Sequence, residues 1–450
     1  MRKSKVRKSV NPKIVQPESI YDLDALFDSE EKRTKLSSVS IGSVMDPKIV
    51  LQTNILSLDL ILGGGMRSGR WYEVAGEESC GKSTWLYEAC SQALQFIPNT
   101  VKGLFVDAEG TLDDVWFSNI TGCEDLTEVF GLRDEKTGNW VKTPIIRRYR
   151  PAVGEQALKF MKGVLQGMPD KVLVKDTWYY MFIPKTSKAA MKANPESGTR
   201  KLQGRLKDKK GNVLYSKELF SKTGNFYVPI PNNYAGPELL MGTDSMASLT
   251  PEAKANEDSG ALGGNARMFG DHVSTIKSEM SKKGVVHFAI NQLREKPMAF
   301  GDPRYTPGGN TLKHAVDCRV FGWKVSVPPP GKGQVLQENG EEYRYAKFKT
   351  YKNKVFLPHK ETLLRWWTGH NGHSGFGCDP VFDTKNYLEM TGQIASVNSK
   401  KFKVLLPGFS KYELDKESFK KMVLTSRLRK RCLTQLKNGK GVKLYMNTLE

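Results

Sequence analysis

The strongest chemical signal in the sequence is a glycine-rich loop that fits the phosphate-binding pattern G-x-x-x-x-G-K-[ST]. Its residues are Gly76, Glu77, Glu78, Ser79, Cys80, Gly81, Lys82 and Ser83. The loop follows a predicted strand and precedes a predicted helix, as the motif requires. In such a loop, backbone N–H groups surround the phosphates and the helix N-terminus adds positive potential. The sequence therefore predicts a nucleoside triphosphate site; the alternative is an ordinary glycine turn with a surface lysine.

Four side chains are expected to carry the chemistry of that site. Lys82 is expected to neutralise the β- and γ-phosphates, and the hydroxyl of Ser83 to ligate Mg²⁺. Asp244 ends an apolar strand, which is the place of a second carboxylate near the metal ion. Glu109 ends another strand, where a carboxylate can orient and activate the attacking water. Taken alone, either acid is also typical of a helix cap or a solvated turn.

Strands alternate with helices around these residues. The sequence predicts strands at 71–75, 103–107, 238–244 and 285–290, with helices at 83–96, 155–166 and 264–282. This alternation is typical of an α/β fold with a mainly parallel sheet.

Composition divides the chain into a core and three basic additions. Residues 1–45 are expected to form a basic tail followed by a helix, and 46–374 the α/β core. Within the core, 171–236 is an insertion rich in lysine, glycine and aromatic residues. Residues 375–450 are expected to form a small basic C-terminal domain, with one helix at 416–437.

The positive charge of the chain is concentrated in these additions. The 450 residues carry a formal net charge of +21. Residues 1–13 contribute +6, residues 171–236 contribute +9 and residues 400–450 contribute +10, so the remaining body is close to neutral. Such an excess predicts a polyanionic partner, first nucleic acid and second an anionic membrane surface. No apolar run approaches the roughly 20 residues of a membrane helix, so a membrane-spanning protein is not expected.

The cysteines indicate neither a disulfide framework nor a zinc site. There are six, they are scattered, and no two of them form a C-x-x-C pair. This usage fits a protein of the reducing cytoplasm. Cys80, inside the phosphate loop, is expected to be a small residue that fits there, and the alternative is a thiol that makes the protein sensitive to oxidation.

Five short motifs together resemble the RecA family of recombinases, in the family's order. They are the phosphate loop, Asp107-Ala108-Glu109, Asp244-Ser245, Asn291-Gln292-Leu293-Arg294 and Gly308-Gly309-Asn310. The resemblance covers about 46–370 without the insertion, and it implies a RecA-like P-loop ATPase core. The motifs are similar to those of bacterial RecA and its phage relatives, and the C-terminal segment is similar in texture to UvsX-type phage recombinases. The resemblance therefore suggests a phage-type (RecA/UvsX-like) strand-exchange ATPase.

The resemblance implies further roles at the nucleotide. The implied nucleotide contacts are the loop residues with Thr84, Asp113, Trp116 and Asp244, and the implied catalytic residues are Lys82, Glu109, Gln292, Lys352 and Lys354. Asp113 and Trp116 fall where the family contacts adenine, although Trp116 is equally typical of a core aromatic. Gln292 is the implied sensor of the γ-phosphate. Lys352 and Lys354 would reach the nucleotide of the adjacent subunit, as an arginine finger does in trans.

The resemblance also implies two DNA-binding loops, at about 254–266 and 294–313. The residues expected to contact DNA are Arg267, Arg294, Lys296, Met298, Phe300, Arg304, Gly308, Gly309, Asn310 and Lys313. The basic residues supply charge, the glycines allow close approach to phosphates, and the apolar residues separate bases or stack on them. Gly270, Ser274 and His314 depart from the family pattern; either the lysines and aromatic residues of the insertion compensate, or the coupling between sites differs.

The implied function is an ATP- and Mg²⁺-dependent recombinase. It would form a helical filament of identical subunits on single-stranded DNA and exchange strands with homologous double-stranded DNA. The helix within 1–45 would then be a polymerisation helix. A single-strand-binding protein or a loader is a further expected partner, no membrane is, and the expected location is the cytoplasm (of a bacterial host if the chain is phage-encoded).

Other functions stay open at this point. One alternative is a ring-shaped helicase or branch-migration motor, RadA-like or like a hexameric helicase, on the same core fold. Another is a DNA coat protein whose ATP site is degenerate, although the intact Lys82, Ser83, Glu109 and Asp244 argue against it. The 171–236 insertion is either an auxiliary DNA-binding surface, or a solvated decoration or subunit contact.

Overall fold

A computed structural model describes most of the chain. The described residues are 50–95, 102–184, 205–233, 237–252, 264–295, 304–325, 336–338, 341–368, 376–410, 412–425 and 427–449. They fall in one compact unit, Met45–Glu450. The basic tail and polymerisation helix predicted at 1–45 lie outside the described residues. None of the described helices is both long and apolar enough to cross a membrane.

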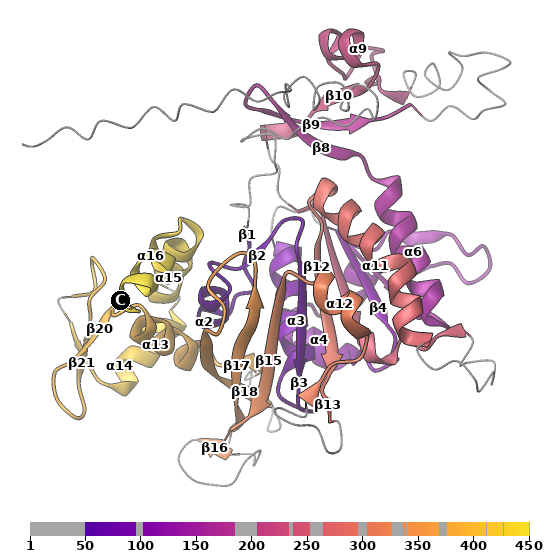
Figure 1. Cartoon of the computed structure of the whole chain (residues 1–450). Coiled ribbons are helices and arrows are strands. Elements are labelled where there is room, and N and C mark those ends of the chain that lie inside the picture. Colours follow the sequence, from indigo (N-terminus) through magenta and orange to yellow (C-terminus); the bar gives the residue numbers. More distant parts are fainter. Residues whose placement is uncertain are drawn as a thin grey trace, which may run out of the picture. The chain divides into compact units, whose positions relative to one another are not determined.

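A ten-stranded sheet forms the centre of this unit (Figure 1). Its parallel strands, in spatial order, are β7 (Ile146–Tyr149), β4 (Lys102–Asp107), β11 (Leu239–Asp244), β12 (Val286–Gln292), β3 (Trp71–Gly76) and β15 (Cys318–Lys324). Antiparallel strands extend it beyond β15: β17 (Glu341–Asn353), β18 (Glu361–Thr368), β19 (Phe376–Cys378), and β16 (Leu336–Glu338) beside β17. The predicted α/β fold with a mainly parallel sheet is therefore confirmed, and the four predicted strands are β3, β4, β11 and β12.

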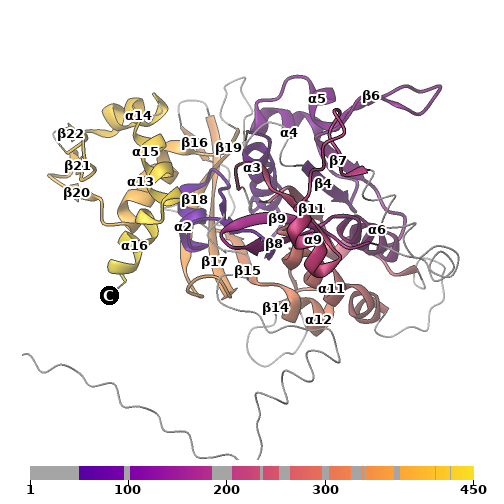
Figure 2. The ribbon, with the colours of Figure 1, turned by 90° about the horizontal axis from the view of Figure 1, so that it is seen from above.

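The central strands are stable because helices bury both faces of the sheet. Trp71 and Tyr72 are successive residues of β3 and point to opposite faces, as the two-residue period of a strand requires. Tyr72 packs in a core with α3 (Lys82–Gln95), whereas Trp71 packs in a core with α6 (Gly154–Gly167) and α11 (Gly264–Lys283) (Figure 2). Burial on both sides explains why these strands appear in the sequence as continuous apolar runs.

Short elements complete the core around this sheet. They are β1 (Val50–Leu51), α2 (Leu56–Ile61), β2 (Met66–Arg67), α4 (Asp114–Thr121), α5 (Leu126–Phe130), β5 (Leu132–Arg133), β6 (Trp140–Lys142), the 3-10 turn η2 (Met246–Ser248), β13 (Arg294–Glu295), β14 (Arg304–Tyr305) and α12 (Gly309–Ala315). The predicted helices at 83–96, 155–166 and 264–282 are α3, α6 and α11.

The basic insertion contains a small antiparallel sheet of its own. Its elements are β8 (Asp170–Val174), β9 (Thr177–Phe182), α9 (Lys217–Thr223), β10 (Phe226–Pro229) and the 3-10 turn η1 (Pro231–Asn233). Tyr215, Phe220 and Phe226 pack against one another, with ring centroids 5.5, 4.8 and 4.6 Å apart. These three aromatic residues therefore form a small internal core rather than an open stacking surface. Residues 185–204 and 234–236 lie outside the described residues.

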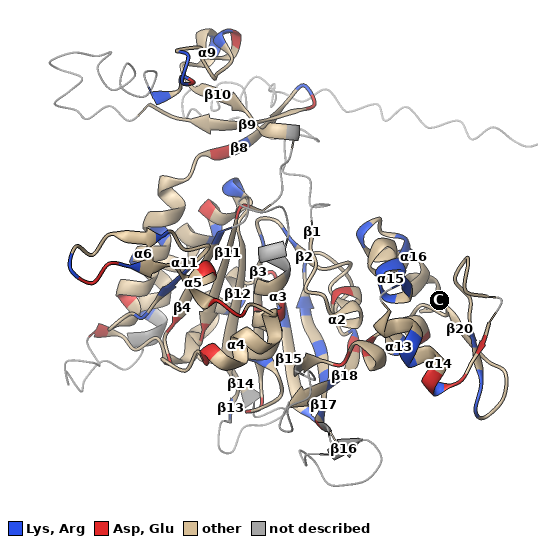
Figure 3. Cartoon of the chain, turned by 180° about the vertical axis from the view of Figure 1, so that it is seen from behind, with Lys and Arg blue, Asp and Glu red and all other residues tan. Residues whose placement is uncertain are grey.

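Helices and a small sheet follow the central sheet at the C-terminal end. They are α13 (Pro380–Met390), β20 (Ile394–Ser396), β21 (Phe402–Val404), β22 (Glu413–Leu414), α14 (Lys416–Leu424), α15 (Arg427–Lys437) and α16 (Lys440–Asn447). Asp383 of α13 fastens them to α2, because its buried carboxylate accepts the N–H groups of Leu56 (2.9 Å) and Ser57 (3.0 Å). Arg429 of α15 pairs with the same carboxylate at 2.9 Å. Lysines and arginines gather on α15 and α16 (Figure 3).

The single basic helix predicted at 416–437 is wrong, because this segment forms two helices. Val423 of α14 and Leu428 of α15 are buried in the same core. In one straight helix, residues five apart would lie about 140° apart around the axis and could not face one core. The first helix instead ends at its C-cap, Thr425, and the second begins at Arg427, which brings both apolar faces to the same side.

Candidate active site

The phosphate loop connects β3 to α3 and lies close against neighbouring strands. Gly81 has a left-handed φ of +97°, and a Cβ atom there would lie 2.5 Å from the Trp366 ring. A Cβ atom at Gly76 would collide with the backbone carbonyl of Gly322. Both motif glycines are therefore required by the packing of this chain as well as by the close approach of a phosphate.

Lys82, the lysine of the motif, points back into the loop. Its Nζ donates to the carbonyl oxygens of Gly76 (3.2 Å) and Glu77 (2.7 Å). The carboxylate of Glu77 accepts the backbone N–H of Lys324 at 3.0 Å, which ties the loop to β15. The ammonium group therefore lies within the loop that would surround the phosphates.

The other loop residues divide between an exposed tip and a buried base. Glu78 and Ser79 are exposed at the tip. Cys80 is buried, and burial raises the pKa of its thiol. A buried thiol of raised pKa stays protonated and is a poor nucleophile, so packing accounts for Cys80. Thr84, in the first turn of α3, is also buried.

Ser83 and Asp244 form a direct pair beside Lys82. The hydroxyl of Ser83 donates to Asp244 Oδ2 at 2.7 Å. Burial raises the pKa of Asp244 to about 6; the negative charge of Glu109 acts in the same direction and the Ser83 hydrogen bond opposes it. A hydroxyl and a carboxylate are oxygen ligands of the kind that Mg²⁺ prefers. This donor set therefore fits a magnesium ion.

Glu109 lies beside Asp244 because β4 and β11 are adjacent parallel strands that end together. The backbone N–H of Glu109 donates to the carbonyl of Asp244 at 3.2 Å. The carboxylate oxygen Oε1 of Glu109 accepts hydrogen bonds from Ser245 Oγ (2.5 Å), Ser248 Oγ (2.9 Å) and Gln292 Nε2 (3.0 Å). The structure thus brings together the predicted catalytic carboxylate and the predicted γ-phosphate sensor. The two serines were not predicted as site residues, and the position of Ser245 directly after Asp244 is the signal that sequence offers.

Asp107 fixes the turn that carries Glu109. Its buried Oδ2 accepts from Arg148 Nη2 (2.8 Å) and Arg150 Nε (3.2 Å), and its Oδ1 accepts the N–H of Thr111 (3.1 Å). A buried carboxylate requires such partners. Both arginines were missed in the sequence because they belong to the region of β7, 41 and 43 residues further along the chain.

Asp113 and Trp116, predicted at the adenine, lie at the start of α4. Asp113 is the N-cap, and its carboxylate accepts the backbone N–H of Trp116 at 2.9 Å. The indole N–H of Trp116 donates to Thr84 Oγ1 at 3.4 Å, and the half-buried ring packs against the core around α3. The tryptophan is thus a core aromatic beside the phosphate-loop helix, and its contact with a base stays a prediction.

A buried network joins β3 to the end of the second predicted DNA loop. Glu73, in the middle of β3, pairs with Arg319 Nε (2.5 Å) and accepts from Asn291 Nδ2 (2.7 Å). The same amide nitrogen donates to the carbonyl of Pro307 (3.1 Å), and Arg319 donates to Thr306 Oγ1 (2.8 Å). We did not predict this network. Its signal in the sequence is Glu73 itself, because a charged residue inside a buried strand requires partners.

The second predicted DNA loop begins and ends on a two-stranded ladder. β13 pairs with β14, and Gly308 then caps α12 with a φ of +108°. Gly308 is buried and Gly309 is half-buried at the start of α12. Among the predicted DNA contacts, Arg294 and Asn310 are exposed and Lys313 is half-buried. Lys296, Met298 and Phe300 lie outside the described residues, as does the side chain of Arg304.

The first predicted DNA loop leads into α11. Arg267, Gly270 and Ser274 are all exposed near the start of this helix. Their spacing of three and four residues places them on one face. Residues 253–263 lie outside the described residues. The structure places Arg267, the predicted DNA contact that directly follows this loop.

Lys352 and Lys354, the predicted contacts to the next subunit, lie at the end of β17. Lys352 Nζ donates to the carbonyls of Lys313 (2.7 Å) and His314 (3.1 Å), in the last turn of α12. An ammonium group is favourable at that end of a helix. Partial burial lowers the pKa of Lys352, and the neighbouring charge of Lys354 acts in the same direction. The side chain of Lys354 is exposed, as is that of His314.

The register of the sheet separates Lys352 from the phosphate loop of its own chain. Lys352 pairs with Arg319, and Arg319 pairs with Glu73, three residues before the end of β3 at Gly76. At about 3.3 Å per residue, Lys352 lies roughly 10 Å back from the edge where the loop begins, and two strands away. A role at a nucleotide would therefore have to be played on another subunit.

Known proteins are similar to this chain over most of its length. The family model of the RecA N-terminal domain matches residues 235–370. The chain is 26% identical to protein RecA of Thermus aquaticus over 388 residues, which are 84% of this chain and 82% of that protein. It is 25% identical to protein RecA of Trichodesmium erythraeum over 366 residues (79% and 73%) and 26% identical to that of Streptococcus mutans over 348 residues (76% and 66%).

Proposed function

The chain belongs to the RecA family, and we propose that it is an ATP-dependent recombinase that assembles on single-stranded DNA and exchanges strands with a homologous duplex. The observation that carries this proposal is the hydrogen bond between Gln292 and Glu109. It connects the carboxylate that would act on water with the residue that leads into the second DNA loop. A change at the γ-phosphate can therefore affect both the carboxylate of Glu109 and the second DNA loop.

The phosphate loop would hold the triphosphate of ATP. Its backbone N–H groups and the N-terminus of α3 provide the anion site, and the Nζ of Lys82 already lies inside the loop. Ser83 would ligate Mg²⁺, and Asp244 would support it through water. Bound Mg²⁺ would neutralise charge on the β- and γ-phosphates. Asp113 and Trp116 would contact the adenine from the start of α4.

Glu109 would activate the attacking water. Water adds to the γ-phosphorus while the bond to the leaving ADP oxygen breaks, and the water proton passes to Glu109, giving ADP and phosphate. Hydrogen bonds from Ser245, Ser248 and Gln292 to Oε1 hold the carboxylate in place, which leaves Oε2 to take the proton. A preorganised group of this kind costs little reorganisation when the reaction occurs.

The network around Glu73 would transmit the state of the nucleotide to DNA. Asn291 bonds Glu73 and Pro307 through its amide nitrogen, and its Oδ1 accepts the N–H of Gln292 at 3.0 Å. A shift of Gln292 would therefore displace both ends of the second loop together. Coupling of this kind requires a physically connected element that two sites share, which this network supplies.

We propose that Lys352 and Lys354 act on the nucleotide of the adjacent subunit in a filament. ATP would then hold subunits together, so that assembly follows the nucleotide state. In the described chain Lys352 caps α12, so entering a neighbour's site would release that helix end. The exposed Arg267 and Arg294 and the loop residues around them would contact the DNA.

Other parts of the prediction remain proposals of the same kind. They are the polymerisation helix within 1–45, the 171–236 insertion as an auxiliary duplex-binding surface, a separate C-terminal domain at 375–450, a single-strand-binding protein or loader as partner, and a phage-type protein working in a bacterial cytoplasm. The exposed lysines of the insertion, such as Lys207, Lys209 and Lys210, support a DNA surface there.

Electron microscopy with ATP, Mg²⁺ and single-stranded DNA tests the proposal against a ring-shaped motor. The proposal predicts helical filaments that depend on ATP and lengthen with the DNA. Closed rings in place of filaments would support the helicase or branch-migration alternative. DNA-stimulated phosphate release, measured on the same sample, excludes a DNA coat with a degenerate site.

A further inference from the structure

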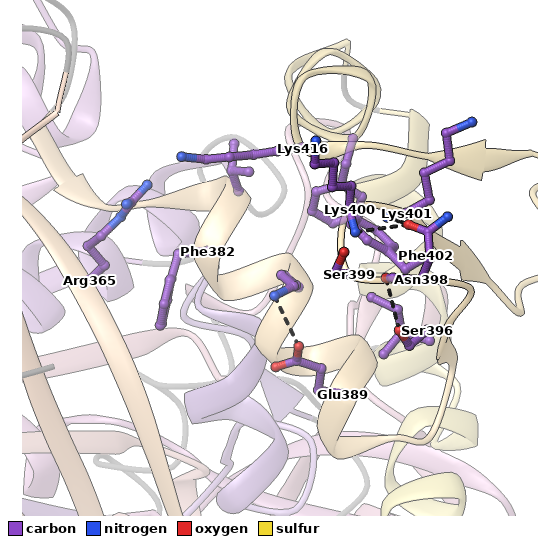
Figure 4. A pocket seen from close by; sticks show the side chains of 14 residues that line it. Arg365, Phe382, Glu389, Ser396, Asn398, Ser399, Lys400, Lys401, Phe402 and Lys416 are labelled. Atoms are coloured by element: carbon purple, nitrogen blue, oxygen red, sulfur yellow. Dashed lines mark hydrogen bonds and ion pairs between the residues drawn. The ribbon is translucent and has the colours of Figure 1, made fainter. Parts of the chain in front are cut away.

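A pocket of about 530 Å³ opens in the C-terminal part of the chain, and none of the residues predicted at the ATP and DNA sites lines it. It lies between α13, the hairpin of β20 and β21, and the first turns of α14 (Figure 4). The residues of its floor are apolar, and include Phe382, Ile394, Phe402 and Phe419. The residues of its rim are cationic, and include Lys385, Lys400, Lys401 and Lys416.

The floor of the pocket is built from packed aromatic rings. Phe402 meets Phe419 edge to face at 5.3 Å, and Phe382 meets Tyr345 in the same way at 5.5 Å. Phe382 and Phe402 are half-buried, so each keeps a surface toward the cavity. The floor is therefore preformed, and an apolar group that enters it is removed from water without rearrangement.

Some polar groups of the wall are occupied by the turn of the hairpin. The carboxamide oxygen of Asn398 accepts the backbone N–H groups of Lys400 (2.9 Å) and Lys401 (2.8 Å). Ser396 Oγ donates to the carbonyl of Asn398 at 3.2 Å. This bonding holds the two lysines at the mouth of the pocket.

The rim carries an excess of positive charge. Glu389 is the one carboxylate that lines the pocket, and it pairs with Lys385 at 3.2 Å. Lys400 and Lys401 are exposed and form no ion pair with other residues that the structure describes. Lys403, the next lysine of the hairpin, does not line the pocket and pairs instead with Glu413 at 3.2 Å. An anionic group at the mouth would therefore meet the exposed ammonium groups of Lys400 and Lys401.

We propose that this pocket binds an acidic peptide segment of a partner protein. A large apolar side chain of the peptide lies on the phenylalanine floor, and carboxylates before and after it meet Lys400, Lys401 and Lys416. Charge complementarity and an apolar interior together select such a ligand. A nucleic acid would meet the same positive charge, so the test below includes one as a competitor.

Fluorescence anisotropy with the full-length protein tests the proposal. The probe is a fluorescein-labelled peptide in which one phenylalanine is flanked on both sides by glutamates. The proposal predicts saturable binding that weakens with salt, and a loss of affinity of about tenfold when the phenylalanine is replaced by serine. A peptide with glutamines in place of glutamates should also bind weakly. Equal binding of all three peptides would overturn the proposal.

Variants of the hairpin locate the binding. The double variant Lys400→Gln/Lys401→Gln should weaken peptide binding about three- to tenfold, while Lys403→Gln on the same hairpin should change it less than about twofold. Equal effects of the two variants would overturn the proposed location. Unlabelled oligothymidylate distinguishes a nucleic-acid site: if it displaces the peptide, and its own binding falls in the double variant, the pocket binds DNA and the proposal is wrong. DNA-stimulated ATP hydrolysis should be unchanged in both variants, so this test is independent of the recombinase function.

Discussion

Gln292 donates a hydrogen bond from Nε2 to Oε1 of Glu109 at 3.0 Å, although 183 residues separate the two in the chain. The bond exists because β12 and β4 flank β11, so that the carboxyl ends of all three strands lie at one edge of the sheet. It places the proposed water-activating carboxylate in direct contact with the residue that leads into the second proposed DNA loop. The following predictions depend on this arrangement.

Glu109→Gln should reduce ATP hydrolysis at least about 100-fold, because the amide cannot accept the proton of the attacking water. ATP binding should persist, since Lys82 and Ser83 are untouched, and the ATP-bound form should remain on DNA longer. Steady-state phosphate release and nucleotide titration measure the two effects. Glu124→Gln, at an exposed acid, is the control. Retention of half the wild-type rate would remove Glu109 from its proposed role.

Asp244 should make the stability of the ligand-free protein depend on pH. Its pKa is raised from 3.8 to about 6, so the folded protein holds this proton more tightly than the unfolded chain. The stabilisation is complete below pH of about 3.8 and is lost as the pH rises through about 6. Asp244→Asn cannot ionise and should avoid this loss, which amounts to roughly 2–3 kcal/mol.

Thermal unfolding without nucleotide measures this effect. At each pH, the unfolding midpoint of the wild type is subtracted from that of Asp244→Asn. This difference should be a few degrees larger at pH 8 than at pH 5. The variant should also lose the Mg²⁺ dependence of ATP binding. An identical pH dependence in both proteins would show that Asp244 titrates as an ordinary exposed carboxyl.

Glu73→Gln should break the coupling network and destabilise the fold. The side chain of Arg319 is 15% exposed, so loss of its carboxylate leaves a largely buried cation without compensation and should cost about 2–4 kcal/mol. ATP binding should remain, while the stimulation of hydrolysis by DNA falls several-fold. Chemical denaturation and phosphate release, with and without single-stranded DNA, measure both.

A second substitution is the control for the buried pair. Glu73→Leu/Arg319→Met removes both charges and should be more stable than Glu73→Gln, yet DNA stimulation should still be reduced several-fold because the bond to Thr306 is gone. Additive losses of stability from the two positions would mean that the pair is not energetically coupled.

Lys352 should act on a neighbouring subunit. Lys352→Ala and Lys82→Ala should each hydrolyse little ATP alone. In an equal mixture on single-stranded DNA, about a quarter of the interfaces combine an intact phosphate loop with an intact Lys352, so about a quarter of wild-type activity should return. No recovery on mixing, with filaments present, would place the function of Lys352 within its own subunit.

The sequence predicted the parts of the site that are local in the chain. The phosphate loop could be recognised because strand, glycines, lysine and helix follow one another within a few residues. The central strands could be recognised because burial on both faces leaves apolar runs such as Trp71–Gly76. Glu109 and Asp244 could be placed together because parallel strands end at one edge.

The parts that the sequence did not predict depend on strand order or on packing. Arg319 is 246 residues from Glu73, and the two meet because β15 lies beside β3 in parallel register. No residue near Glu73 in the sequence indicates that β15 is the neighbour of β3. The prediction of one helix at 416–437 was wrong because basic residues run through the whole segment, while the buried residues before and after Thr425 would lie on different faces of a single helix. Tyr215 and Phe226 are among the aromatic residues that made the insertion a possible DNA-binding surface, and the structure packs their rings against each other.

Strand exchange is the measurement that tests the central claim most directly. The purified chain, single-stranded DNA and a homologous linear duplex are incubated with ATP and Mg²⁺, and joint molecules are resolved on a gel. Joint molecules should form with the wild type and with Lys136→Ala, at an exposed lysine far from the site in sequence, and none should form with Lys82→Ala or with a heterologous duplex. Joint molecules that form equally well with Lys82→Ala, or none with the wild-type protein under filament-forming conditions, would contradict it.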